Sequence, residues 1–198
     1  MTELEARWNA YYKNSVDVPH HPQTEDAARL NRSGNMTAID CGCGIGADIY
    51  YLANLGYKVH GFDSHPEAVR TCREKFLENS AVSIVQSSFE DYTYPQTGLI
   101  VANSSLYFSE PSVFDDTWRK ISGALTPGGI FSGHFLGLDD DWNQHSDHTI
   151  NAFSESDVQD LFSNFRVHHF HEKHEMGKTR VGKTKFWHIY SVVAEKVG

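Results

Sequence analysis

The sequence predicts an α/β protein in which helices cover both faces of a mostly parallel sheet. Short apolar runs alternate with amphipathic helical stretches from residue 36 onward, and such alternation builds parallel sheets. A glycine-rich turn, residues 42–46, stands between the first strand and its helix. The last two strand-like runs follow one another without a helix, so we expect an antiparallel hairpin at one edge of the sheet.

The N-terminal part is expected to be helical. Trp8, Tyr11 and Tyr12 fall on one face of a first helix, and the stretch VDVPHHP then interrupts it. A second short helix is expected over residues 24–32, with Thr24 as its N-cap. The three aromatic side chains either close over a ligand as a lid or simply pack the first helix onto the domain.

From residue 36 onward, apolar periodicity and the residues that bound each run define the elements. Gly56 ends the first of these helices, Pro66 opens the second, and Ser154 caps the last. The turn at residues 127–129, Pro-Gly-Gly, leads into the fifth strand. Strands are expected at residues 36–41, 57–62, 81–86, 99–102, 130–136, 165–174 and 185–196, and helices at residues 46–55, 67–78, 113–125 and 154–162.

Length and composition fit one domain after an N-terminal segment. We expect residues 1–35 to form a helical lid segment and residues 36–198 to form a single globular domain. The net charge of −9 argues against nucleic acid or an anionic membrane as a partner. The three cysteines show no disulfide spacing, and neither a signal peptide nor an apolar run of ~18 residues is present. These features predict a cytoplasmic protein and leave its oligomeric state open.

The glycine turn lies where parallel sheets bind ligands, at the carboxyl end of the first strand. Glycines allow a sharp turn and let the backbone approach a ligand closely. Asp63 ends the neighbouring strand, and a carboxylate there can accept hydrogen bonds from two ribose hydroxyls. Strand, glycine turn, helix, strand and terminal acid together predict a site for a nucleoside-containing cofactor.

Two cofactors compete for this site. Gly42, Gly44, Ala47 and Asp63 also satisfy a dinucleotide fingerprint. Asp40, however, precedes the first glycine, where it would repel a pyrophosphate and attract a ligand that carries an ammonium and a sulfonium. An NAD(P)-dependent oxidoreductase of the short-chain kind would also need a Tyr-x-x-x-Lys dyad, which the sequence lacks.

These residues resemble the class I S-adenosylmethionine-dependent methyltransferases. The run DCGCGIG at residues 40–46 is similar to their first motif, Asp63 matches the acid that holds the cofactor ribose, and LTPGGIF at residues 125–131 matches the turn before strand five. The resemblance implies a Rossmann-like seven-stranded sheet of order 3-2-1-4-5-7-6 with strand 7 antiparallel. The layout is similar to the small-molecule branch that includes the tellurite-resistance methyltransferases.

The resemblance implies transfer of a methyl group from S-adenosyl-L-methionine to a small-molecule acceptor by in-line displacement, with S-adenosyl-L-homocysteine as product. The alternatives are an NAD(P)-dependent oxidoreductase and a non-catalytic protein that binds a nucleoside cofactor. At Ser88 the family often has an acid that accepts from the adenine amino group, so this chain departs from the pattern there. The cofactor-binding residues implied are Asp40, Gly42, Gly44, Gly46, Asp63, Ser64, His65, Ser88, Phe89 and Asn103.

Residues on the acceptor side are expected after strands four and five and on the closing hairpin. The candidates are Tyr107, His134, Trp142 and His188. For each histidine, a satisfied structural position is the alternative to catalysis. The basic residues of the hairpin, Lys178, Arg180, Lys183 and Lys185, are expected to be solvated.

No metal is expected. Strand alternation places His169 and His171 on one face and His168 and His174 on the other, and no third ligand is evident. The two cysteines that flank Gly42 stand too close together for a zinc knuckle and are expected to pack behind the glycine turn.

Overall fold

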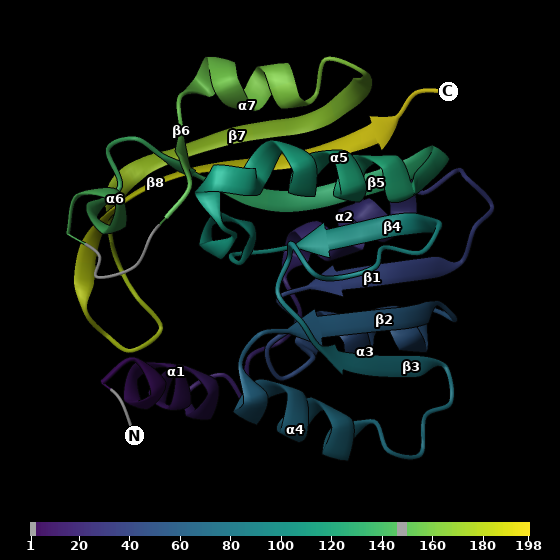
Figure 1. Ribbon diagram of the computed structural model, residues 1–198, viewed down its shortest axis with the longest axis horizontal. Helices are drawn as coiled ribbons and strands as arrows, with labels where there is room; N and C mark the ends of the chain where they lie inside the picture. Colours follow the sequence, from purple (N-terminus) through teal and green to yellow (C-terminus); the bar gives the residue numbers. More distant parts are fainter. Residues whose placement is uncertain (1–2, 146–149) are drawn as a thin grey trace.

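Seven strands of the central sheet lie in the order β3-β2-β1-β4-β5-β8-β7 in the computed structural model, which describes residues 3–145 and 150–198 (Figure 1). Strand β8 is antiparallel to both β5 and β7. This arrangement confirms the expected sheet; a two-residue strand, β6 (Ala152–Phe153), pairs with the end of β5 and shifts the numbering. The other strands are β1 (Thr37–Cys41), β2 (Lys58–Asp63), β3 (Val82–Gln86), β4 (Thr97–Ala102), β5 (Leu125–Gly137), β7 (Phe165–Lys178) and β8 (Thr184–Lys196).

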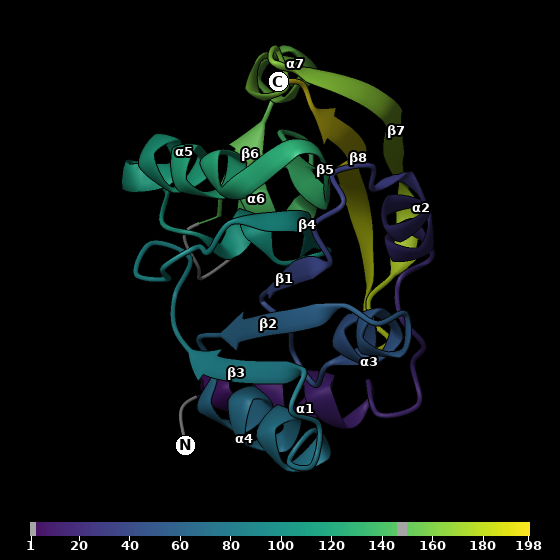
Figure 2. The same cartoon turned by 90° about the vertical axis from the view of Figure 1, so that its right-hand side faces the viewer.

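Helices cover both faces of the sheet, and a separate apolar core lies under each layer. Figure 2 shows α5 on one side of the sheet and α2 and α3 on the other. Trp118, Phe131 and Phe135 belong to the first core, and Ile49, Leu52 and Val59 to the second. The helices are α1 (Glu3–Lys13), α2 (Pro22–Leu30), α3 (Ala47–Asn54), α4 (Pro66–Lys75), α5 (Phe114–Ala124), α6 (Asp141–His145) and α7 (Glu155–Leu161), with 3-10 turns η1 (Leu106–Phe108) and η2 (Pro111–Val113).

Caps explain where several helices begin. Ser154 caps α7 as expected, in a capping box with Asp157. The expected cap at Thr24 is wrong: α2 begins at Pro22, and the cap is His21, whose Nδ1 accepts from the Gln23 amide at 3.2 Å. The Thr24 hydroxyl instead donates to Asp48 at 2.8 Å. A contact with another helix therefore uses the hydroxyl that the local sequence pattern predicts as a cap.

Strand β5 begins five residues earlier than expected. Leu125 pairs with Thr97, and the register between β4 and β5 then shifts before Leu99. The Pro-Gly-Gly turn therefore lies within the strand as an irregularity rather than before it. None of the helices in the described ranges has the length and apolar character needed to cross a membrane.

Candidate functional site

The glycine turn and Asp63 converge at the carboxyl ends of β1 and β2. One carboxylate oxygen of Asp63 accepts from the Gly44 amide at 2.9 Å, and the other accepts from the His65 amide at 2.9 Å. Burial raises the pKa of Asp63, and the two amides oppose that shift. The acid is thus fixed against the turn, with lone pairs left on both oxygens for a further donor.

The three glycines of the turn have positive φ angles, between 53° and 77°, but their missing side chains make room for different neighbours. A Cβ at Gly42 would lie 2.5 Å from the Ser105 Cβ, and one at Gly46 would lie 2.6 Å from the Phe76 ring. A Cβ at Gly44 would meet only Tyr12, at 3.5 Å. The missing side chains of Gly42 and Gly46 therefore make room for other side chains of the protein. Of the three glycines, only Gly44 lies against Tyr12.

Two buried side-chain atoms at this edge of the sheet, Asn103 Oδ1 and His65 Nδ1, have no hydrogen-bond partner among the described residues, and the buried Asp40 carboxyl group lies beside them. No residue of the described ranges donates a hydrogen bond to the Asp40 carboxyl group, which is 4% exposed. Asn103 uses its amide nitrogen on Thr24 at 2.9 Å and leaves Oδ1 unpaired. His65 Nδ1 is unpaired as well. Because an unpaired buried acceptor is costly, this constellation fits a ligand that brings its own donors.

Burial raises the pKa of Asp40 well above its ordinary value, and the nearby charge of Asp48 adds to the shift. The neighbours that influence this carboxyl group are therefore acids and thiols rather than cations. A cationic group bound here would reverse the shift.

The remaining cofactor candidates surround the same edge. Phe89 is buried, packs edge-on against Phe62, and lies under Gly42. The Ser88 hydroxyl donates to the Asp91 carboxylate at 3.1 Å, so a carboxylate lies next to the position where the family often has one, three residues further along the chain. Ser64 is exposed, and its carbonyl accepts from Gln86 at 3.2 Å.

Helix α1 lies over the turn. Tyr12 is 8% exposed, its hydroxyl lies near Asp63 and helps to lower the pKa of that acid, and its ring lies 5.3 Å from the His65 ring. Trp8 stacks on Tyr12 at 5.9 Å and meets Phe108 at 5.2 Å. Two shallow surface hollows lie along α5 and include no residue of the glycine turn. In this conformation, the Tyr12 side chain fills the space beside Gly44 and Asp63.

Two of the four acceptor-side candidates come together in an aromatic group. Tyr107 and Trp142 have ring centroids 6.1 Å apart, and Phe108 connects them to Trp8 of α1. Burial raises the pKa of Tyr107, so its phenol stays protonated at neutral pH. The hairpin closes the same side, because Arg180 near its tip lies 5.4 Å from the Tyr11 ring.

Lys185 is buried rather than solvated, which corrects the expectation from sequence. Its ammonium lies 3.9 Å from the Trp142 ring centroid and 3.8 Å from that of Trp187, and it pairs with the fully buried Asp140. Burial lowers the pKa of Lys185, and Asp140 opposes the shift. Two indole faces and one carboxylate thus compensate the buried charge.

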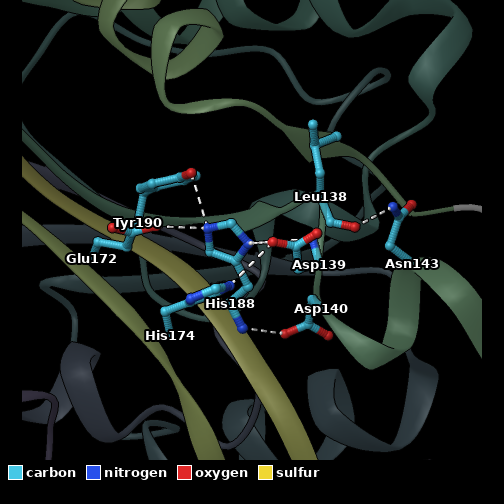
Figure 3. Close-up of polar contacts among 8 residues, drawn as sticks. All are labelled: Leu138, Asp139, Asp140, Asn143, Glu172, His174, His188 and Tyr190. Atoms are coloured by element: carbon cyan, nitrogen blue, oxygen red, sulfur yellow. Dashed lines mark hydrogen bonds and ion pairs between the residues drawn. The ribbon is translucent and has the colours of Figure 1, made fainter.

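The two histidine candidates have other ring neighbours than this aromatic group. His134 is 5% exposed, accepts from the Ser104 amide at 3.0 Å, and lies 4.8 Å from the His21 ring. Burial lowers the pKa of His134 to about 3, so the ring stays neutral and supports Ser104, whose φ is 56°. His188 belongs to a polar cluster on the β7–β8 hairpin (Figure 3).

Comparison with known proteins agrees with this geometry. Residues 38–129 match the family model described as a methyltransferase domain. The carboxy-S-adenosyl-L-methionine synthase of Yersinia enterocolitica is 26% identical over 169 residues, covering 78% of this chain and 64% of the relative. The chain therefore spans less than two thirds of that relative's length.

Two solved structures share the fold. TehB from Haemophilus influenzae has a TM-score of 0.76 at 19% identity, covering 94% of this chain and 65% of that one. The 1,6-didemethyltoxoflavin-N1-methyltransferase of Burkholderia thailandensis, solved with 1,6-didemethyltoxoflavin and S-adenosylhomocysteine, has a TM-score of 0.68 at 18% identity, covering 98% and 88% of the two chains.

Proposed function

We propose that this chain, whose residues 38–129 match a methyltransferase-domain model, is a class I S-adenosylmethionine-dependent methyltransferase that methylates a small-molecule acceptor. The observation that carries the proposal is the convergence at one edge of the sheet of the Gly44 amide, Asp63, the buried Asp40 and two unpartnered polar atoms, Asn103 Oδ1 and His65 Nδ1. When bound, the cofactor supplies an activated sulfonium methyl group for in-line transfer and leaves as S-adenosylhomocysteine.

The polar groups at this edge suit the two ends of that cofactor. Asp63, held by two backbone amides, has free lone pairs for the ribose hydroxyls. Asp40 and Asn103 Oδ1 are acceptors without donors, as a methionine ammonium requires. His65, whose amide contacts Asp63, and Phe89, which packs edge-on against Phe62, would flank the adenine.

The acceptor side supports a small molecule that is already a nucleophile. Trp8, Phe108, Tyr107 and Trp142 form a wall between α1, η1 and α6. Neither Tyr107, with its raised pKa, nor His134, whose Nδ1 accepts an amide, is available as a general base at neutral pH. We therefore propose an acceptor that needs none, such as a thiolate, an oxyanion or a neutral amine.

Titration calorimetry and a labelled-methyl assay test the proposal. S-adenosylmethionine and S-adenosylhomocysteine should bind at micromolar levels, about −8 kcal/mol, and NADH should not bind. Label should then pass to at least one member of a panel of thiols, oxyanions and amines. Binding of NADH alone would refute the cofactor assignment, and cofactor binding without turnover on the panel would favour a binding protein.

The name of the Yersinia relative adds a third outcome to this assay. If the cofactor were converted into a new adenosine-containing product instead of S-adenosylhomocysteine, the activity named for that relative would replace methyl transfer as the proposal.

We also propose that α1 acts as a lid whose Tyr12 hydroxyl competes with the ribose for Asp63. Tyr12→Phe keeps the ring that covers Gly44 but removes the hydroxyl near Asp63 that, in this proposal, the ribose must displace. We expect affinity for S-adenosylhomocysteine to rise by roughly two- to tenfold, since a hydrogen bond contributes about 0.5–1.5 kcal/mol. Calorimetry on both proteins measures this, with Tyr50→Phe, an exposed tyrosine on α3, as control. A lower affinity in Tyr12→Phe would mean that the hydroxyl binds the cofactor directly.

A further inference from the structure

The β7–β8 hairpin and the loop after β5 bring two histidines and a carboxylate together on one side of the sheet (Figure 3). His174 and His188 are directly opposed partners in the antiparallel register, and their ring centroids lie 4.4 Å apart. Asp139, just beyond β5, reaches both: one of its oxygens lies 3.1 Å from His174 Nε2 and 3.7 Å from His188 Nδ1. Cross-strand pairing thus supplies the third group that the spacing of the β7 histidines does not reveal.

We propose that Asp139, His174 and His188 form a binding site for a divalent transition-metal ion such as Zn²⁺. Two imidazoles and one carboxylate are donors that Zn²⁺ prefers, and three protein ligands leave one position for water or a small ligand. The three donor atoms lie within 4.8 Å of one another. In a tetrahedral zinc site with bonds of about 2.0–2.1 Å, donor atoms are about 3.3 Å apart, so two of the contacts already have nearly the required spacing.

A supporting layer fixes the buried ligand. His188 is 6% exposed, and its Nε2 lies 2.9 Å from both Glu172 Oε1 and the Tyr190 hydroxyl. A proton on Nε2 satisfies Glu172 and directs the Nδ1 lone pair toward Asp139, which is the carboxylate–histidine–metal arrangement of many zinc sites. Gly137 admits the ring, because a Cβ there would lie 2.2 Å from His188 Cγ.

The open side of the cluster gives an ion a way in. The side chains of His174 and Asp139 are 45% and 66% exposed, so both can change rotamer to coordinate a metal ion. At present the Asp139 backbone amide lies 3.2 Å from His188 Nδ1, and metal binding exchanges that weak contact for a coordinate bond. Asp139 and Glu172 also supply negative charge beside two histidines, which favours a cation.

Zinc titration of the untagged 198-residue chain against a chromogenic chelator tests the site. Wild-type protein should take up one equivalent with micromolar or tighter affinity, and Co²⁺ should give visible d–d absorption. His174→Ala, which removes an exposed ligand, should weaken binding by more than about tenfold, and Glu172→Gln by about 10- to 100-fold. His171→Ala is the matched control, because His171 is an exposed residue of the same strand outside the cluster, and it should bind as wild type.

Failure here is separable from failure of the proposed methyl transfer. If one equivalent of zinc does not bind, or if His174→Ala binds as tightly as His171→Ala, the cluster is a hydrogen-bonded network without a metal and the inference is wrong. Affinity for S-adenosylhomocysteine, measured on the same His174→Ala preparation, should equal that of wild type. Melting curves add a second readout: zinc should raise the melting temperature of wild type and not that of His174→Ala.

Discussion

Replacement of Asp63 by alanine is expected to weaken binding of S-adenosylhomocysteine by roughly 10- to 150-fold. The ribose would lose its charged acceptor, and hydrogen bonds to charged groups contribute about 1.5–3 kcal/mol. The effect should be large because Asp63 is buried and preorganised: two backbone amides hold its carboxylate in place before any ligand arrives. Calorimetry measures the change directly.

A stability control belongs with this measurement, because alanine also leaves the Gly44 and His65 amides without their acceptor. The melting temperature of Asp63→Ala should therefore be recorded beside its affinity. Asp160→Asn, an exposed acid on α7, should change neither quantity. If Asp63→Ala folds and binds with wild-type affinity, the ribose lies elsewhere and the proposed orientation of the cofactor is wrong.

Asp40→Asn is expected to have opposite effects on stability and on binding. The raised pKa means that the folded chain favours the protonated acid. Asp40 therefore supports folding fully below its unfolded pKa near 3.8, and that support is lost as pH rises through the folded pKa. The uncharged amide escapes this loss. At pH 8 we expect the variant to be the more stable protein, because only the wild-type side chain must bury a negative charge there, and at pH 4 the difference should become small.

Binding should move the other way. The cofactor ammonium would lose a buried counter-charge, so S-adenosylmethionine should bind about tenfold or more weakly to Asp40→Asn. Urea unfolding at pH 4 and pH 8 and calorimetry at pH 8 test the two halves, with Asp160→Asn again as the reference. A variant that is less stable at pH 8 would show that Asp40 gains a stabilising partner in the folded chain.

The features predictable from sequence are those that depend on neighbours along the chain. The strand order is expected from the resemblance to a known family, whereas the glycine turn and the cap at Ser154 each follow from residues within one βα unit. The pairing of Gly44 with Asp63 also belongs here, because adjacent parallel strands end at the same edge.

What the sequence does not reveal depends on side chains that meet across long separations. Lys185 is buried because Asp140 and two tryptophans, one from α6 and one from β8, surround it, whereas its spacing among basic residues is typical of a solvated loop. His174 lies opposite His188 because of the strand register, and it contacts Asp139, which is 35 residues away in the sequence. Thr24 donates a hydrogen bond to Asp48 on another helix instead of capping its own helix.

The packing of the ammonium of Lys185 between two indoles has a practical consequence for spectroscopy. The chain has four tryptophans, and only Trp118 belongs to the interior core, against Phe131 and Phe162. The other three sit in α1, α6 and β8, next to a tyrosine, a phenylalanine or a cation. Three of the four tryptophans that emit therefore lie where α1, α6 and β8 meet the proposed acceptor side. Binding of a ligand there can be followed by the change in native tryptophan fluorescence, without an added dye.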